Sequence, residues 1–175
     1  MEKRKVAVLV EDLYQELEVW YPALRFREAG HEVVLVGTGE KSEYKSKVGY
    51  PARADTDIGK IRVMDFDAVI IPGGYAPDIL RRYDKVNAFV RDMDKAGKII
   101  GAICHAGWVL VSAGILKGRT GTSFFAIKDD MTAAGMTWVD REVVVDGNLI
   151  TSRKPDDLPA FCRASVKPSC DPMQS

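Results

Sequence analysis

Four short apolar runs constrain the fold of this chain more than any other feature of its sequence. They cover Val6–Val10, Val33–Val36, Ala68–Ile71 and Lys98–Ile103. None of them alternates polar with apolar residues, as a strand with one face in water would. Uninterrupted runs of this length are typical of strands buried on both faces of a parallel sheet.

Helical segments separate these runs. Leucines and a tryptophan recur at helical spacing over Leu13–Ala29, where Gly30 follows as a stop signal. Further helices are predicted over Ile79–Ala96 and Trp108–Ala113. Strands that alternate with helices of this length predict an α/β protein, a flavodoxin-like three-layer α/β/α sandwich with a mainly parallel sheet.

Two stretches depart from this alternation. Residues 37–57 are predicted to form an excursion with short strands around Val48–Tyr50. Towards the C-terminus we expect a short helix, a hairpin and a last helix, over residues 126–134, 142–151 and 156–164. A chain of 175 residues suits a single domain, which we place at 1–166, with a frayed tail at 167–175.

Charge and composition narrow the possible partners. Lys plus Arg and Asp plus Glu number 25 each, so neither nucleic acid nor an anionic membrane is an expected partner. No apolar run approaches the roughly 20 residues of a membrane span. The N-terminus lacks a signal-peptide pattern, which predicts a cytoplasmic location. Three cysteines in such a chain argue against a disulfide framework.

Function is expected where the parallel strands end, because ligands of open α/β sheets bind beyond the carboxyl ends of the strands. Three segments meet at that edge: Glu11–Glu18, Pro72–Gly74 and Cys104–Gly107. The third places a cysteine between a buried strand and a helix.

Cys104 has small neighbours on both sides, which suits the tight, strained turn of a nucleophile elbow. At a helix N-terminus the positive end of the dipole would stabilise the thiolate and lower the thiol pKa. The alternative is a small buried filler, which is the commoner role of a free cysteine. Its position favours a reactive Cys104, whereas Cys162 is expected to fill a helix face and Cys170 to lie in the tail without a role.

Histidines are scarce in this chain, which has two. His31 is expected to be a solvent-facing turn residue on the opposite edge of the sheet, so elimination leaves His105 as the candidate base. No other Cys and His set has ligand spacing, so no metal or other cofactor is expected. A glutamine amidotransferase would need a later histidine, and none follows His105.

Two further features have a structural and a chemical interpretation. The backbone N–H groups of Gly73 and Gly74 form either a simple turn or an oxyanion hole beside Cys104. Glu18 is either a surface carboxylate that favours the helix dipole or a buried acid with a raised pKa that donates to the thiolate.

Several segments, taken in order, resemble the ThiJ/PfpI superfamily over about residues 5–165. They are Glu18–Pro22, Pro72–Asp78 and Ala102–Gly107. Later segments are similar to the PfpI-type intracellular cysteine peptidase branch, which is related to the Parkinson-associated protein deglycase; they are Gly121–Ser123, Ile127–Met131, Trp138–Asp140 and Glu142–Asn148.

The resemblance implies roles for particular residues. Cys104 matches the nucleophile, His105 the histidine that follows it, and Glu18 the acid that hydrogen-bonds the cysteine. Gly74 and the His105 amide match the oxyanion-hole donors. Asp78 stands where the branch has an acid that completes a triad with the histidine of a neighbouring subunit, which implies a homodimer and its further assembly into a hexamer.

The resemblance leaves three functions open. The first is a stress-response cysteine hydrolase of the PfpI peptidase type acting on peptides. The second is a protein deglycase or glutathione-independent glyoxalase, in which Cys104 adds to methylglyoxal or its adducts. The third is a non-enzymatic redox sensor or chaperone, in which Cys104 is oxidised to a sulfinate beside Glu18.

Overall fold

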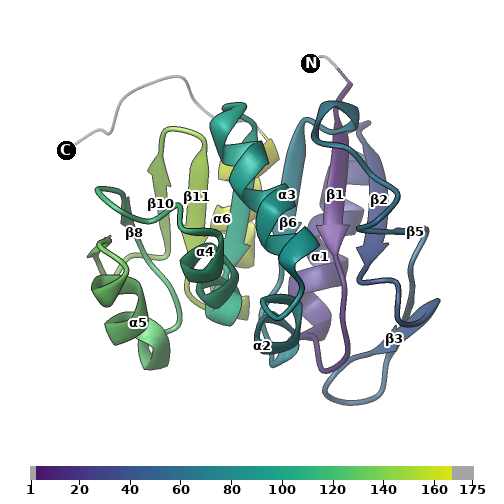
Figure 1. Cartoon of the computed structure of the whole chain (residues 1–175), viewed down its shortest axis with the longest axis horizontal. Coiled ribbons are helices and arrows are strands. Elements are labelled where there is room, and N and C mark those ends of the chain that lie inside the picture. Colours follow the sequence, from purple (N-terminus) through teal and green to yellow (C-terminus); the bar gives the residue numbers. More distant parts are fainter. Residues whose placement is uncertain (1–2, 167–175) are drawn as a thin grey trace.

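A seven-stranded sheet forms the centre of the computed structural model, which describes residues 3–166 (Figure 1). Its strands pair in parallel except for the antiparallel pair at one edge. From that edge the order is β10 (Val143–Asp146), β11 (Leu149–Ser152), β7 (Ile99–Ile103), β6 (Ala68–Ile71), β1 (Lys5–Leu9), β2 (Glu32–Gly37) and β5 (Thr56–Asp57). The predicted α/β class and the predicted hairpin are both confirmed.

Helices cover both faces of the sheet, as a three-layer sandwich requires (Figure 1). One face carries α1 (Glu16–Glu28) and α6 (Leu158–Val166), and the other carries α2 (Ala76–Leu80), α3 (Asp84–Lys95) and α4 (Gly107–Ala113). α5 (Lys128–Ala133) packs beside α4. Two small sheets lie outside, formed by β3 (Glu43–Lys45) with β4 (Pro51–Arg53) and by β8 (Thr120–Gly121) with β9 (Thr137–Trp138). Short 3₁₀ turns span Val63–Asp65, Cys104–Ala106, Phe125–Ile127 and Pro155–Asp157.

The four apolar runs form the buried centre of this sheet. β1 lies between β2 and β6, and β6 lies between β1 and β7, so each has helices above and below it. All four residues of β6 are buried, as are the last four of β1 and of β7. A strand covered on both faces leaves no position for a polar side chain, which is why these segments do not alternate.

The strands predicted around Val48–Tyr50 are wrong, because these residues form the turn between β3 and β4. Gly49 has a left-handed φ of +86°, and its N–H donates to the Ser46 carbonyl at 3.0 Å. The Ser46 hydroxyl also accepts from the N–H of Tyr50 at 2.9 Å. Side chain and backbone of one serine therefore close the turn and leave the strands to either side.

The single helix predicted over Ile79–Ala96 is two helices. α2 ends at Leu80, and Tyr83 takes an extended backbone before α3 begins. The Asn87 side chain donates to the Arg81 carbonyl at 2.8 Å, which satisfies a group left free where the helix breaks. Apolar spacing continues across the break, so the sequence pattern does not reveal it.

The helix α1 buries a different face from the one that its leucines suggest. Its buried residues include Glu18, Val19, Ala23 and Phe26, whereas Leu17 is 54% exposed and Leu24 58% exposed. Both sets have helical spacing, so the pattern predicts the helix correctly but not which side packs on the sheet.

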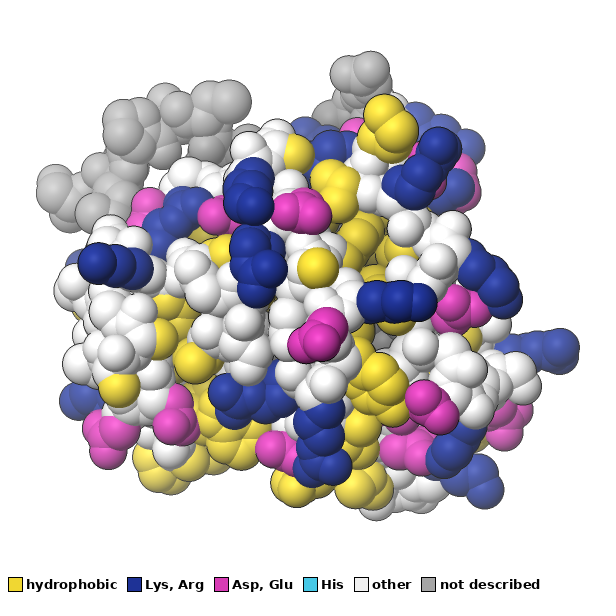
Figure 2. Space-filling model, in the orientation of Figure 1, with side chains coloured by type: hydrophobic (Ala, Val, Ile, Leu, Met, Phe, Trp, Pro, Cys, Tyr) yellow, Lys and Arg dark blue, Asp and Glu magenta, His cyan; other side chains and the backbone are white. Residues whose placement is uncertain are grey.

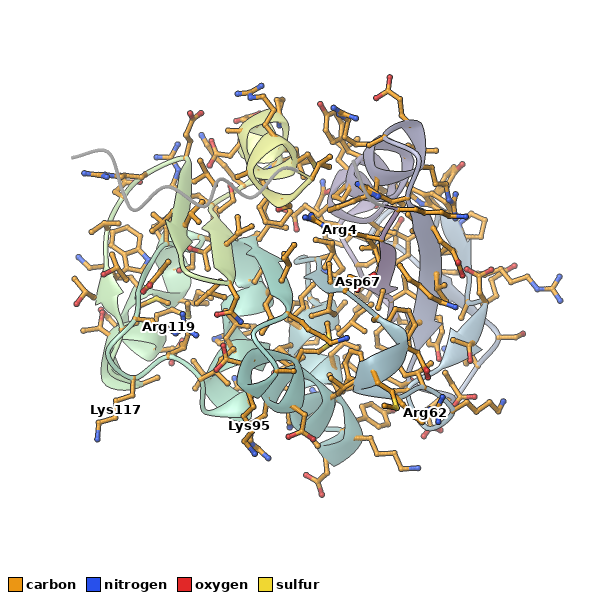
Figure 3. The ribbon with its side chains drawn as sticks, turned by 90° about the horizontal axis from the view of Figure 1, so that it is seen from above. Arg4, Arg62, Asp67, Lys95, Lys117 and Arg119 are labelled. Atoms are coloured by element: carbon orange, nitrogen blue, oxygen red, sulfur yellow. The ribbon has the colours of Figure 1, made fainter. Side chains whose placement is uncertain are left out.

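His31 is buried, which makes the prediction of a solvent-facing residue wrong. Its Nδ1 accepts the Arg4 N–H at 3.1 Å, and its ring lies 5.9 Å from that of Phe26. It does lie at the edge opposite the candidate site, where Figure 3 shows Arg4 and Asp67. There its hydrogen bond with Arg4 joins the residue before β2 to the residue before β1.

The C-terminal part of the described chain is regular. Pro159, which falls inside the predicted last helix, is the second residue of α6, where a missing N–H leaves no bond unmade. The predicted tail with Cys170 lies outside the described residues. Within residues 3–166 no helix combines the length and apolar character of a membrane span. Basic and acidic side chains are interspersed over the face shown in Figure 2.

Candidate active site

Cys104 takes a left-handed backbone conformation with φ of +62°, at the turn from β7 into α4. A non-glycine residue at such an angle is strained by about 1–3 kcal/mol and persists when its surroundings hold it there. The Phe124 N–H contributes by donating to the Cys104 carbonyl at 3.2 Å. The thiol sits at the carboxyl end of the central strands, as predicted, and the residue is 8% exposed.

The small residues around Cys104 are required by close packing. A Cβ on Gly107 would stand 2.4 Å from the Met131 sulfur, and one on Gly101 would stand 2.7 Å from the end of the Ile70 side chain. The helix after the cysteine can therefore approach α5, and the strand before it can approach its neighbours. The contact at Gly107 therefore lies directly after the turn that carries the thiol, whereas the contact at Gly101 lies within the strand before it.

Glu18 is wholly buried and lies under the turn that follows β6. Its Oε2 accepts the Gly73 N–H at 2.7 Å, while its Oε1 is buried without a hydrogen-bond partner in the described chain. A Cβ on Gly73 would stand 2.5 Å from Glu18 Oε2, 2.7 Å from Cys104 Cβ and 3.0 Å from the His105 nitrogen. The carboxyl, the cysteine and the amide of His105 therefore surround one glycine. Of the two interpretations of Glu18, the structure agrees with the buried carboxyl, and its role as a donor to the thiolate stays a prediction.

Burial dominates the electrostatics of this pair. It raises the pKa of Glu18 to about 7, although the Gly73 N–H and Cys104 act in the opposite direction. Burial, followed by the Glu18 carboxylate, raises the pKa of Cys104 to about 12. The backbone N–H groups of His105 and Gly74 oppose that rise. The expected lowering by the helix dipole is wrong, because desolvation and a neighbouring carboxylate outweigh a helix of seven residues.

One consequence is that Glu18 can hold a proton near neutral pH. A protonated carboxyl no longer repels the thiolate, and it can donate to sulfur or to an oxygen bound beside it. The site therefore contains an acid next to its nucleophile.

His105 adopts the orientation that a pair of adjacent residues needs. Its Nδ1 lies 3.2 Å from Cys104 Sγ. The ring stacks on Phe124 with centroids 5.0 Å apart and meets the edge of Trp108 at 5.2 Å. Burial, and then the nearby Lys47 cation, lowers the pKa of His105, so the imidazole is neutral at pH 7 and able to accept a proton.

Gly73 and Gly74 lie directly above the cysteine. Gly74 has φ of +79° and pairs with Tyr14, and a Cβ there would stand 2.5 Å from the Leu13 carbonyl oxygen. Only glycine fits that position. The N–H groups of Gly74 and His105 both act to lower the pKa of the Cys104 thiol, and their predicted role as an oxyanion hole stays a prediction.

Asp78 is the predicted site residue that the fold does not bring to the cysteine. It forms an ion pair with Arg82 one turn along the chain. Burial acts in the opposite direction, but hydrogen bonds from Arg82 and Tyr75 lower the pKa of Asp78. No hydrogen bond or ion pair joins Asp78 to His105 within residues 3–166.

Three residues near the site were not predicted. Phe124 and Trp108 hold the His105 ring, and Lys47 places a cation near it. The adjacent aromatics Phe124 and Phe125 are a visible signal, whereas nothing in the sequence distinguishes Lys47 from other lysines of the excursion. Phe124 also lines a hollow of about 200 Å³ together with Ser123, Phe125, Trp138, Asp140, Arg153 and Lys154.

Metal chemistry has no donor set in this part of the chain. Within the described residues, no group of three or more His, Cys, Asp and Glu side chains is arranged to hold a metal ion. The chemistry available at the site is that of a thiol, an imidazole, a carboxyl and two backbone amides.

A cysteine on a strained strand-to-helix turn, paired with a histidine and a buried acid in an α/β sandwich, defines a class of proteins with a nucleophile elbow. Within that class the chain belongs to the DJ-1/PfpI family, whose model matches residues 4–168. The resemblance stated from the sequence is confirmed.

Relatives and solved structures agree with this assignment. The chain is 43% identical to the Pyrococcus furiosus protein named Deglycase PfpI over 163 residues, which is 93% of this chain and 98% of the relative. It is 39% identical to the Bacillus subtilis protein named Putative cysteine protease YraA, again over 163 residues, with 93% and 96% covered. The crystal structure of Drosophila melanogaster DJ-1beta superimposes with a TM-score of 0.87 at 28% identity, covering 95% of this chain and 92% of that one.

Proposed function

We propose that the protein is a cysteine-dependent enzyme of deglycase or glyoxalase type, which acts on methylglyoxal and on the adducts it forms with amines. The observation that carries this proposal is the shape of the site. The Cys104 thiol is nearly buried, with Glu18, Gly73 and the His105 amide gathered around it. Such a site admits a small carbonyl compound more readily than an extended polypeptide. The name of the Pyrococcus furiosus relative supports the same substrate class.

The reaction begins with addition of the thiol to the aldehyde carbon. The S–C bond forms as the C–O π bond breaks, and His105 or Glu18 passes the thiol proton to the oxygen, which the amides of Gly74 and His105 bind. One proton then moves from the former aldehyde carbon to the former ketone carbon, and the hydroxyl proton moves to the former ketone oxygen, which gives a lactate thioester. Water hydrolyses the thioester, so methylglyoxal plus water yields lactic acid and the thiol is regenerated. With an amine adduct, the S–C bond forms as the C–N bond breaks, the departing amine takes up the thiol proton, and the same hemithioacetal results.

The test uses the purified full chain with methylglyoxal and with its adduct on N-acetylarginine. We expect lactate from both and released N-acetylarginine from the second, and neither product from Cys104→Ser. A panel of fluorogenic peptides is run in parallel. Cleavage of peptides that depends on Cys104, without lactate formation, would overturn the proposal in favour of the peptidase.

Peptide hydrolysis, the first function that the sequence suggests, is the second candidate. It is favoured by the name of the Bacillus subtilis relative and by amides placed to bind an acyl oxyanion. In it Cys104 attacks the peptide carbonyl, His105 protonates the departing amine, and water releases the acyl group. We place either activity in a stress response, because reactive carbonyls and damaged proteins accumulate together.

The proposed assembly is a homodimer, which a hexamer could extend, in which Asp78 of one subunit contacts His105 of the other. Two features support it. Within residues 3–166 Asp78 forms no hydrogen bond or ion pair with His105, and α1 exposes Leu17, Tyr21 and Leu24 along one side. We expect Asp78→Asn to lower kcat about tenfold without changing the oligomer mass measured by light scattering. An unchanged kcat in an intact oligomer would remove Asp78 from the site.

A further inference from the structure

Lys47 is fixed next to the active-site glycines by backbone hydrogen bonds. Its N–H donates to the Tyr14 carbonyl at 3.0 Å, and Tyr14 pairs in turn with Gly74. The next residue in the same turn donates its N–H to Glu16 Oε1 at 3.1 Å, at the start of the helix that carries Glu18. The turn between β3 and β4 therefore borders the cysteine site.

The charge of Lys47 is available to a ligand. Lys41 and Lys60 form ion pairs with Asp12 and Asp57, whereas Lys47 is exposed and forms no ion pair with the residues from 3 to 166. Burial and then the Lys47 cation lower the pKa of His105, and the same cation is a minor opposing influence on the raised pKa of Glu18, after burial, the Gly73 N–H and Cys104. Backbone position and charge together place Lys47 at the border of the site.

We propose that Lys47 is a specificity-determining residue, which favours carbonyl substrates that carry a carboxylate directly beside the carbonyl group. The inference rests on the proposed carbonyl chemistry at Cys104 and names its substrate class more closely. A carboxylate bonded to the carbonyl carbon stays close to the reacting sulfur, and its attraction to a lysine charge weakens with distance.

Glyoxylate is the smallest member of this class. The Cys104 thiol adds to its aldehyde carbon, the S–C bond forms, and the thiol proton ends on the former carbonyl oxygen. The product is a hemithioacetal whose carboxylate faces Lys47. No oxidant or reductant is needed, and the addition is reversible.

The first test compares two alkylating reagents of nearly equal shape and different charge. Iodoacetate and iodoacetamide each form an S–C bond to Cys104 with loss of iodide, and the rate ratio cancels any general change in thiol reactivity. We expect Lys47→Gln to lower the iodoacetate-to-iodoacetamide ratio roughly threefold or more at low salt, by loss of one Coulomb contact. The difference should shrink at about 0.5 M salt.

The matched control is Lys45→Gln, which removes the same charge from an exposed position two residues away. Its ratio should equal that of the unsubstituted protein, and Cys104→Ser gives the background from the other cysteines. An unchanged ratio in Lys47→Gln, or an equal fall in Lys45→Gln, would overturn the proposal.

The second test uses glyoxylate itself. We expect the concentration that half-protects Cys104 from iodoacetamide to rise at least threefold in Lys47→Gln and to stay constant in Lys45→Gln. Equal protection in all three proteins would exclude the carboxylate preference. Neither test requires turnover, so a protein inactive on methylglyoxal but selective for iodoacetate would reject the proposed function and keep the role of Lys47.

Discussion

Two buried cysteines in this molecule have the same raised pKa and different surroundings. Burial raises the pKa of Cys162 in α6 to about 12, with a small opposing effect of Arg25. Burial also leads the rise of Cys104 to about 12, but there the Glu18 carboxylate adds to it and two backbone N–H groups oppose it. Cys162 lies within a regular helix, whereas Cys104 has a left-handed backbone.

The comparison teaches that the pKa of a thiol does not by itself distinguish a site from a core residue. Cys162 lies in the middle of α6, and no side-chain hydrogen bond to its sulfur is formed within residues 3–166. Around Cys104 the imidazole, the carboxyl and the two amides converge. The two regions differ in the interactions that their groups can make once a substrate carbon is bound to the sulfur.

The largest expected difference comes from removing each thiol. Cys104→Ser should lower kcat/KM on methylglyoxal by roughly 10³-fold or more, because the nucleophile is lost. Cys162→Ser should leave kcat/KM unchanged and lower the free energy of unfolding by about 1–2 kcal/mol, because a hydroxyl replaces a buried apolar group. Urea denaturation and lactate assays on both variants measure this; equal loss of activity would erase the contrast.

A second contrast adds one methyl group to each region. Gly73→Ala places a Cβ among Glu18, Cys104 and His105, so we expect a loss of about 10²-fold in kcat/KM. Gly101→Ala places one 2.9 Å from the Phe161 ring of α6, so we expect a loss of about 1–3 kcal/mol in unfolding free energy and activity within about threefold. Thermal melts must accompany the assays. If Gly73→Ala lost activity only because the protein unfolds, the result would not support a role of Gly73 in the site.

A smaller effect concerns the pH at which Cys104 reacts. Ionised Glu18 raises the pKa of this thiol, so Glu18→Gln, which removes the charge, should move the midpoint of iodoacetamide alkylation down by roughly one unit. Turnover should fall nevertheless, because the acid is gone. The alkylation midpoint of Cys162, measured in proteins that also carry Cys104→Ala, should be the same with and without Glu18→Gln. A midpoint for Cys104 that rises in Glu18→Gln would contradict this account of the pair.

The smallest expected effect is partial oxidation. With dilute peroxide we expect added oxygen at Cys104 and none at Cys162, since Cys104 is 8% exposed and Cys162 is 1% exposed, and since the amides beside Cys104 can bind sulfur oxygens. Peptide mass spectra give both sites in one digest. Oxidation at Cys162 alone would reverse the comparison and remove support for a redox role.

Sequence reasoning predicted local features better than long-range contacts. The buried strands, the hairpin and the elbow at Cys104 follow from runs and spacings of a few residues. The solvent-facing position expected for His31 was wrong, because its burial depends on contacts with β1 and α1. The spacing within α1 did not reveal which face it buries, because two helical faces of equal spacing cannot be ranked without knowing what lies opposite. The break before Tyr83 depends on a side chain six residues from the carbonyl it satisfies, which periodicity does not detect.

The sequence by itself determined that Cys104 would stand at the carboxyl end of a buried strand, because strand burial and small turn residues are local properties. Tertiary structure alone decided that Glu18, 86 residues earlier, is buried beneath it and that Lys47 borders the site. It also decided that the pKa of the Cys104 thiol is raised, because burial outweighs the lowering expected from the helix dipole. The physical reason is that desolvation and charge depend on what the whole fold places around a group, whereas backbone conformation depends mainly on its neighbours in sequence.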